Sequence, residues 1–220
     1  MISAIVCALN EAPTIGNVLN ALTKSKKIGE IIVISDGSRD QTAVIARAFG
    51  VQVIEHKRRK GKAQSMHEGV SKAQGESILF LDADLYNITT KHIDLLIATH
   101  TKDKQSMVVG LRDRGWLLNM IARAFPRISG ERILPRDLFE KTPDRFKKGY
   151  QIEAALNATA RFYNREISTV RLKGVTVRTK LQKNSTVYAL TQYLSMSAQV
   201  LSGLLLTSAT LWQQHSKTKK

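Results

Sequence analysis

The chain has 220 residues, of which 43% are hydrophobic and 24% are charged, so it can bury a substantial core. This composition excludes an intrinsically disordered protein, and the length leaves little room for two full domains. The formal net charge of +16 predicts an anionic partner, which is a nucleic acid, an acidic membrane surface or a phosphorylated small molecule.

The single cysteine, Cys7, lies in an apolar run, which excludes an intramolecular disulfide and favours a cytoplasmic location. The N-terminus leads directly into a strand-like run, without the basic region and cleavable apolar stretch of a secretory signal. The five histidines show no metal-ligand spacing, so a zinc site is not expected.

In the first half of the chain, short apolar runs alternate with helical patterns. The runs are typical of strands buried on both faces, and they are Ile2–Leu9, Glu30–Ser35, Val51–Glu55 and Ser77–Leu81. The helices are expected to start at Pro13, after Ser38 and at Gly61. This alternation predicts an α/β fold with a mostly parallel sheet and helices on both faces.

Each of the first two helices has a predicted inner face. The first has an apolar side with helical spacing, made of Ile15, Val18, Leu19 and Leu22. The second is expected to carry Asp40 in its first turn and to bury Val44, Ile45 and Ala48.

The second half of the chain gives weaker signals. Helices are expected over Thr90–Thr99, Gly115–Phe125 and Tyr150–Tyr163, and strands over Ser106–Leu111, Ile167–Leu172 and Gly174–Arg178. We divide the chain into residues 1–110, which bind the nucleotide, residues 111–182, which form the acceptor half of the same domain, and a C-terminal extension, 183–220.

Two acids follow the apolar run that ends at Leu81. Asp82 and Asp84 are two residues apart, so on an extended chain both carboxylates project to the same side. Such a pair suits Mg²⁺ or Mn²⁺, which prefer oxygen ligands and are shared with substrate phosphates.

Polar residues also follow the other predicted strands. Asn10 and Glu11 follow the first strand, and Asp36 follows the second, where an acid can accept a hydrogen bond from a base or a ribose. A basic loop from Lys57 follows the third strand, and its Gly61 and Lys62 suit diphosphate oxygens. In a parallel sheet these residues converge on one edge.

These motifs resemble family 2 glycosyltransferases of the GT-A fold. The resemblance is carried by Asn10-Glu11, Asp36-Gly37-Ser38-Arg39-Asp40-Gln41-Thr42, Gly61-Lys62-Ala63, Gly69, Ala73-Gln74-Gly75 and Leu81-Asp82-Ala83-Asp84-Leu85. It implies a Rossmann-like catalytic half in which Glu11 and Asp36 line the nucleoside pocket. It also implies that Lys62 approaches the base or diphosphate, Asp82 approaches the ribose or metal, and Asp84 ligates the metal.

Residues 129–180 are similar to the acceptor half of polyprenyl-phosphate and phosphoglycerate glycosyltransferases. The motifs are Ser129-Gly130-Glu131-Arg132, Gly149-Tyr150-Gln151-Ile152-Glu153 and Gly174-Val175-Thr176. The similarity implies acceptor contacts from Arg132, Tyr150 and Glu153. Where phosphoglycerate-type relatives often carry a metal-binding histidine, this chain has Val177 and Arg178.

The predicted activity is metal-dependent transfer of a sugar from a UDP- or GDP-sugar to a hydroxyl or phosphate acceptor, including a lipid phosphate. If the reaction inverts the anomeric centre, Glu131 or Asp113 is the candidate base by position. A nucleotidyltransferase and a basic nucleic-acid-binding module are the alternatives. The second is disfavoured because it would not need paired acids at a strand end.

Val187–Gln214 contains no charged residue, but Ser, Thr and Gln interrupt it too often for a membrane span. We expect a helix whose apolar stripe rests on an anionic membrane surface, on a second copy of the chain or on the catalytic domain. Trp212 and the basic tail after it are typical of a helix at lipid headgroups, which predicts a peripheral location on the inner membrane face.

Overall fold

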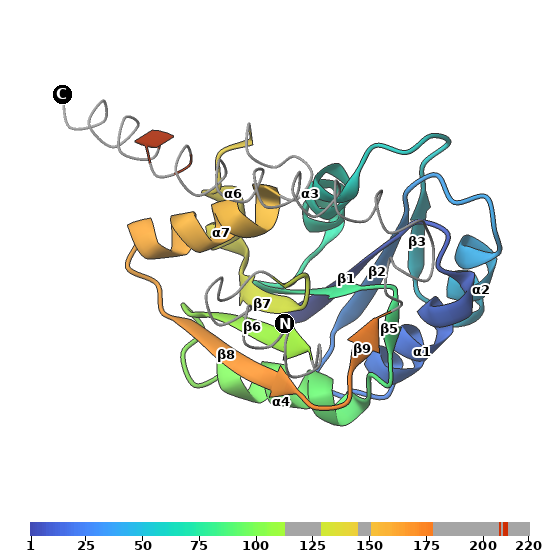
Figure 1. The fold of residues 1–220 in the computed structure, drawn as a ribbon, viewed down its shortest axis with the longest axis horizontal. Coiled ribbons are helices and arrows are strands. Elements are labelled where there is room, and N and C mark those ends of the chain that lie inside the picture. Colours follow the sequence, from blue (N-terminus) through green and yellow to red (C-terminus); the bar gives the residue numbers. More distant parts are fainter. Residues whose placement is uncertain (113–128, 145–150, 178–206, 208, 211–220) are drawn as a thin grey trace, which may run out of the picture.

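The computed structural model describes residues 1–112, 129–144, 151–177, 207, 209 and 210. It confirms the α/β class, because a seven-stranded mixed sheet lies at the centre with helices on both faces (Figure 1). The strand order is β3-β2-β1-β4-β7-β6-β8. In sequence order these strands are β1 (Ile2–Ala8), β2 (Glu30–Ser35), β3 (Gln52–Glu55), β4 (Ser77–Asp82), β6 (Met107–Arg112), β7 (Arg132–Pro135) and β8 (Ile167–Leu172).

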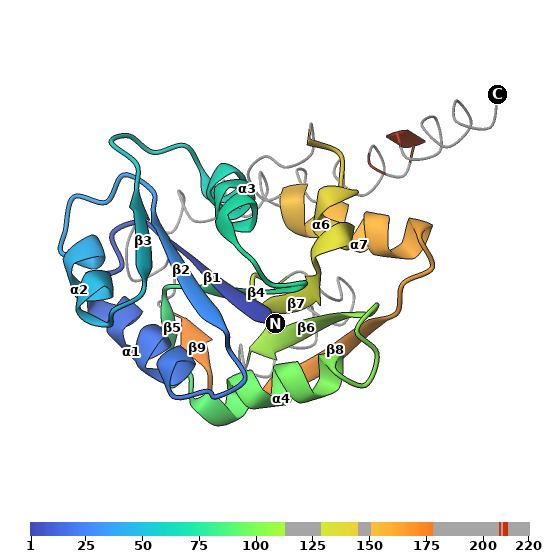
Figure 2. The same cartoon turned by 180° about the vertical axis from the view of Figure 1, so that it is seen from behind.

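Two helical layers cover the sheet, as Figures 1 and 2 show from opposite sides. One layer holds α1 (Ala12–Thr23), α2 (Thr42–Ala48) and α4 (Thr90–His100), and the other holds α3 (Lys62–Lys72), α6 (Arg136–Glu140) and α7 (Gln151–Phe162). Each layer has its own apolar core: Val18 and Leu96 belong to the first, and Met66 and Leu156 belong to the second. A short antiparallel pair, β5 (Leu85–Tyr86) and β9 (Thr176–Val177), lies beside the main sheet.

The direction of β7 matters most for the site. Strands β1, β2, β3 and β4 pair in parallel, whereas β7 runs antiparallel to both β4 and β6. The start of β7 therefore lies at the same sheet edge as the ends of β4 and β6. This strand was not predicted, because four residues that include Arg132 and Pro135 show no strand periodicity.

The first and third helices form as the sequence indicates. In α1, Pro13 occupies the first turn, where its missing N–H costs nothing, and Ile15, Val18, Leu19 and Leu22 are all buried. In α3, Gly69 faces β1, and a Cβ atom at this position would lie 2.6 Å from the Cγ2 atom of Ile5. The glycine thus allows the helix to pack closely on the sheet.

The expected inner face of α2 is wrong for Val44, which is 63% exposed, and for the exposed Ala48, whereas Ile45 packs against the first core. The buried residues of the helix are Thr42, Ala43 and Ala46. The helix begins at Thr42, so Asp40 lies before it and not in its first turn. The Asp40 carboxylate instead accepts hydrogen bonds from the amides of Thr42 and Ala12, at 3.0 and 3.1 Å.

The expectations for Gly115–Phe125 and for nearly all of Val187–Gln214 lie outside the described residues. Within the second segment only Thr207, Ala209 and Thr210 are described, and all three are helical. Across the described ranges, no helix combines the length and apolarity that a bilayer crossing requires. The membrane and dimer contacts of this segment stay predictions.

The close approach of α3 to β1 predicts a stability effect. Gly69→Val should lower the free energy of unfolding by about 1–3 kcal/mol, because added methyl groups must displace the buried Ile5 side chain. Urea unfolding followed by circular dichroism measures the change. Helix propensity cannot cause this loss, because valine has a higher helix propensity than glycine. Gln64→Val, at an exposed position of the same helix, measures the cost of a β-branched side chain without the clash, and an unchanged stability of Gly69→Val would contradict the close packing.

Candidate functional site

The site is assembled from strand ends at one edge of the sheet. Asp36 follows β2, His56 follows β3, and Asp82 and Arg112 end β4 and β6. The reversed β7 brings Gly130 and its neighbours to the same edge. Because the backbone of a buried strand is fully paired within the sheet, side chains at these ends are the groups available to a ligand.

Asp82 and Asp84 lie where the chain turns from β4 into β5. Ala83 between them is buried, whereas both acids are partly exposed, which agrees with carboxylates that share one side. Burial and the neighbouring Asp82 charge raise the pKa of Asp84 above its ordinary value. Within the described residues, the buried Oδ1 atom of Asp84 has no hydrogen-bond partner.

Lys62, at the start of α3, bridges two halves of the site. Its Nζ atom donates to Asp82 Oδ1 at 2.7 Å and to Glu153 Oε1, on α7, at 2.9 Å. Burial lowers the pKa of the Lys62 ammonium, but Asp82 and Glu153 outweigh it, so its pKa lies above the usual range. Burial raises the pKa of Asp82, yet Lys62 and Arg112 reverse that effect and lower it.

A second ion pair lies deeper in the same edge. Arg112 Nε is 3.4 Å from Glu131 Oε2, and the Ser129 hydroxyl donates to the same carboxylate. Glu131 is fully buried, which raises its pKa although Arg112 opposes the shift. Burial lowers the pKa of Arg112, but Glu131, Asp82 and Asp84 together raise it above its ordinary value.

Arg132 is fully buried and its guanidinium is used inside the protein. Its Nε and Nη2 atoms donate to the Ser129 carbonyl at 3.0 and 2.6 Å, and Nη1 donates to the Glu153 carbonyl at 3.3 Å. The side chain therefore ties the start of β7 to α7. This placement gives Arg132 a positioning role for Glu153, which carries the carboxylate that Lys62 contacts.

Gly130 allows the backbone before β7 to pass directly over Asp82. A Cβ atom at this position would lie 2.6 Å from the Cγ atom of Asp82, and it would come at least as close to both carboxylate oxygens. No side chain fits there without displacing the Asp82 carboxylate. The glycine thus couples the acceptor-side motif to the acid pair.

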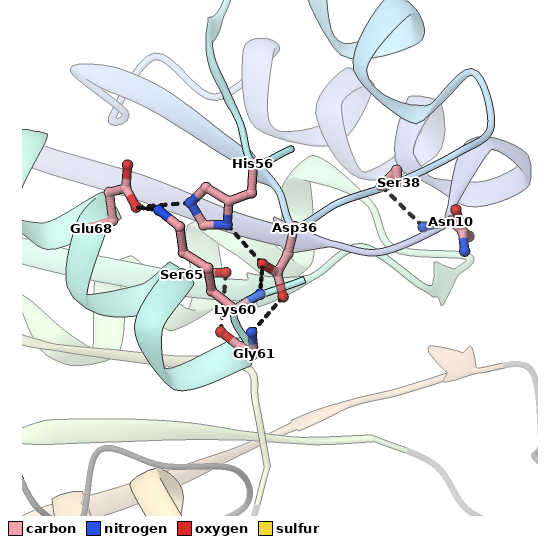
Figure 3. A network of polar contacts seen from close by, with 8 residues as sticks. All are labelled: Asn10, Asp36, Ser38, His56, Lys60, Gly61, Ser65 and Glu68. Atoms are coloured by element: carbon pink, nitrogen blue, oxygen red, sulfur yellow. Dashed lines mark hydrogen bonds and ion pairs between the residues drawn. The ribbon is translucent and has the colours of Figure 1, made fainter. Parts of the chain in front are cut away.

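Asp36 organises the loop between β3 and α3, as Figure 3 shows. Its Oδ1 atom accepts from the Lys60 amide at 2.7 Å and contacts His56 Nδ1 at 2.7 Å, and its Oδ2 atom accepts from the Gly61 amide at 2.7 Å. Burial raises the pKa of Asp36, but these hydrogen bonds outweigh it and lower the pKa below its ordinary value. Gly61, the residue directly before α3, has a φ of 99°.

Asn10 and Glu11 form a separate part of the site on the loop after β1. The Asn10 amide donates to Ser38 Oγ at 3.1 Å (Figure 3). Asn10 has a φ of 56°, and its Oδ1 accepts from the Arg39 amide at 2.8 Å. The Glu11 amide donates to Thr42 Oγ1 at 2.9 Å. These bonds fix the loop against the chain that follows β2, so Asn10 shapes the backbone there.

The structure brings most of the predicted site residues to this one edge. Gly61, Lys62, Asp82, Glu131, Arg132 and Glu153 are linked by contacts or chain continuity, and Asp36 joins them through Gly61. Asp113 and Tyr150 lie outside the described residues. Sequence analysis missed Arg112, although a charged residue directly after an apolar strand was a usable signal. It also missed His56 and Glu68 as partners, since no spacing pattern announces them.

This geometry agrees with the comparison to known families. A model described as glycosyl transferase family 2 matches residues 3–167. The chain belongs to glycosyl transferase family 2. The match spans both the strand ends of the first half and the reversed strand β7. Membership in this family favours glycosyl transfer over the nucleotidyl transfer that the acid pair alone left open.

Two kinds of relative are informative. The 4,4'-diaponeurosporenoate glycosyltransferases of Staphylococcus aureus strains MRSA252 and USA300 are 31% identical to this chain over 101 residues. The match covers 44% of this chain and 27% of those proteins, so the chain spans about a quarter of the length of these curated relatives.

Solved structures of glucosyl-3-phosphoglycerate synthase from Mycobacterium tuberculosis resemble the whole domain. The complex with Mn²⁺, UDP-glucose and phosphoglyceric acid has a TM-score of 0.77 and 25% identity, covering 95% of this chain and 80% of that one. The complex with Mn²⁺, UDP-glucose and glycerol 3-phosphate has a TM-score of 0.76 and 26% identity, with the same coverage.

The Asp36 network predicts a pH dependence of stability. Because the pKa of Asp36 is lowered in the fold, its contribution is present above the ordinary Asp value, near 3.9, and is lost as the pH falls through the lower folded value. The wild type should therefore lose stability more steeply than Asp36→Asn as the pH falls below about 4. Thermal unfolding of both proteins across that range measures the difference, and parallel curves would contradict the assignment.

Proposed function

We propose that the chain transfers a glycosyl group from a UDP-sugar to a hydroxyl or phosphate group of an anionic acceptor, with Mg²⁺ or Mn²⁺ bound at Asp84 and Asp82. The observation that carries this proposal is the buried Asp84 Oδ1 atom without a partner, beside a second carboxylate, in a family 2 glycosyltransferase. GDP-sugars are the other donors that the sequence motifs allow.

The residues present fit a divalent cation of this kind. Mg²⁺ and similar ions are commonly held by one or two carboxylates and complete their coordination with substrate phosphates and water. In the described part of the chain, no group of three His, Cys, Asp or Glu side chains forms a closed metal cage, which agrees with such an open site. When bound, the cation would offset negative charge on the diphosphate leaving group.

The chain's own cations act on the same charge. Lys62 contacts Asp82 and Glu153, and Arg112 contacts Glu131 while its charge also acts on both acids of the pair. We assign them to stabilise the departing diphosphate, because fixed charges lose nothing to reorganisation during the reaction. The nucleoside end of the donor site is lined by Asp36, Glu11 and Asn10, and Gly61 allows the phosphates to approach the backbone closely.

The acceptor side is proposed from position and charge. The neighbouring synthase was solved with phosphoglyceric acid and with glycerol 3-phosphate, and a net charge of +16 suits an anionic acceptor. We propose that Arg132 and Glu153 position the acceptor side of the site through contacts inside the protein and that Tyr150 contacts the acceptor. Glu131 and Asp113 stay the candidate bases for an inverting reaction, and the Glu131 contacts also orient Arg112.

Asp84→Asn is the direct test of the acid pair. Turnover with Mg²⁺ or Mn²⁺ should fall by about 100-fold or more, because the substitution removes the negative charge and one of the two carboxylate oxygens that would receive the cation. The variant should fold at least as well as the wild type, since the raised pKa of Asp84 means that its charge is disfavoured in the metal-free fold. Glu166→Gln, an exposed acid at the opposite sheet edge, is the matched control. Unchanged activity of Asp84→Asn would refute the proposed site.

A donor panel tests the nucleotide. UDP-glucose with Mn²⁺ should raise the melting temperature, whereas UDP-glucose with EDTA should not, because donor and cation bind the folded state together. At a ligand concentration about 100 times Kd, the gain in unfolding free energy is about 2.7 kcal/mol. GDP-glucose and other UDP-sugars serve as comparisons. A larger, cation-dependent shift with the GDP-sugar would replace UDP by GDP in the proposal.

A further inference from the structure

His56 is enclosed by two carboxylates that come from different elements. Its side chain is 2% exposed, with Nδ1 at 2.7 Å from Asp36 Oδ1 and Nε2 at 2.8 Å from Glu68 Oε2 (Figure 3). Asp36 follows β2, and Glu68 lies on α3. A buried imidazole with a carboxylate at each nitrogen is not required by the fold, because an apolar side chain would fill the same space.

The geometry requires a proton on each ring nitrogen. Hydrogen bonds from His56 lower the pKa of Glu68, and in Asp36 such bonds overcome the effect of burial, so both carboxylates are ionised and can only accept. A neutral imidazole has one donor and one lone pair, and the lone pair would face a carboxylate oxygen. The ring is therefore held as an imidazolium.

Other charged groups lie around the ring, and the basic ones among them oppose its positive charge, which therefore depends on the two direct carboxylate contacts. Lys60 Nζ lies 3.3 Å from the same Glu68 oxygen, so it competes with the imidazolium for that carboxylate without reaching Asp36. Glu55, Lys57, Arg58 and Arg59 line a hollow of about 460 Å³ beside the ring, together with Lys60 and Glu68. From β1, Cys7 is a neutral thiol, because burial raises its pKa to about 12.

The imidazolium is connected to the donor site by a short chain of contacts. The His56 ring holds Asp36, and the Asp36 carboxylate receives the amides of Lys60 and Gly61. Gly61 is followed by Lys62, which reaches Asp82 and Glu153. Glu68 lies on the same helix as Lys62, so both contacts of the ring constrain the start of α3.

We propose that His56, as an imidazolium clamped between Asp36 and Glu68, is a positioning residue that places Gly61 and Lys62 for donor binding. The donor half of this statement rests on the proposed function, whereas the placement of the loop does not. Loss of either contact of the ring releases one carboxylate and loosens the loop, so donor affinity falls.

The first experiment reads the ring and the loop without any substrate. Long-range ¹H–¹⁵N NMR should show both His56 nitrogens protonated at neutral pH, and a neutral tautomer would overturn the proposal. In His56→Gln, the Lys60 and Gly61 amides should exchange with solvent about tenfold faster or more, as expected when a hydrogen bond to a charged group is lost. His67→Gln, an exposed histidine on the same helix, is the control. Equal protection of these amides in wild type and His56→Gln would also overturn it.

The second experiment separates positioning from general destabilisation. In His56→Gln, KM for UDP-glucose should rise about tenfold, and kcat should fall by a smaller factor because Lys62 also acts on the departing diphosphate. Glu68→Gln keeps the shape of the side chain but removes one carboxylate that holds the ring, so it should also raise KM for UDP-glucose. A fall in kcat with an unchanged KM for UDP-glucose would refute the proposal. If the wild type turns over no sugar nucleotide, the proposed function fails, and amide exchange still decides whether His56 places the loop.

Discussion

The central constraint on this protein is that buried carboxylates at one sheet edge must be matched by positive charge. Four acids gather there against three cations, so the described site holds one positive charge fewer than negative. The acids are Asp82, Asp84, Glu131 and Glu153, and the cations are Lys62, Arg112 and Arg132. Burial makes the charged form of a carboxylate costly, and it raises the pKa values of Asp84 and Glu131 although Arg112 opposes both shifts. The cation of the proposed function would offset this cost.

Much of the first half could be predicted from the sequence because its signals are local. Glu30–Ser35 and Ser77–Asp82 are apolar runs of strand length, and the helices between them bury residues at a spacing of three and four. Acids directly after such runs must lie at the sheet edge, so Asp36 and Asp82 were identified by position alone. The inner face of α2 was predicted only in part, because periodicity alone does not decide which side of a helix of seven residues faces the sheet.

The rest of the site depends on contacts between distant parts of the chain. Arg132 belongs to a motif that resembles an acceptor site. Its guanidinium nevertheless donates hydrogen bonds to the Ser129 and Glu153 carbonyls, which only the fold places around it. His56 and Glu68 are 12 residues apart, and nothing in their spacing indicates a pair. The direction of β7 was equally hidden, because strand direction depends on pairing partners and not on composition.

The reversed strand also has an evolutionary consequence. Strand β6 ends and β7 begins at the edge that holds the acid pair, so both ends of the chain segment that joins them are anchored at this edge. Insertions, deletions or exchanges between these two ends leave the pairing of the described strands unchanged. The fold thus allows a lineage to vary the chain that joins the two strands while it preserves the sheet that positions the acid pair.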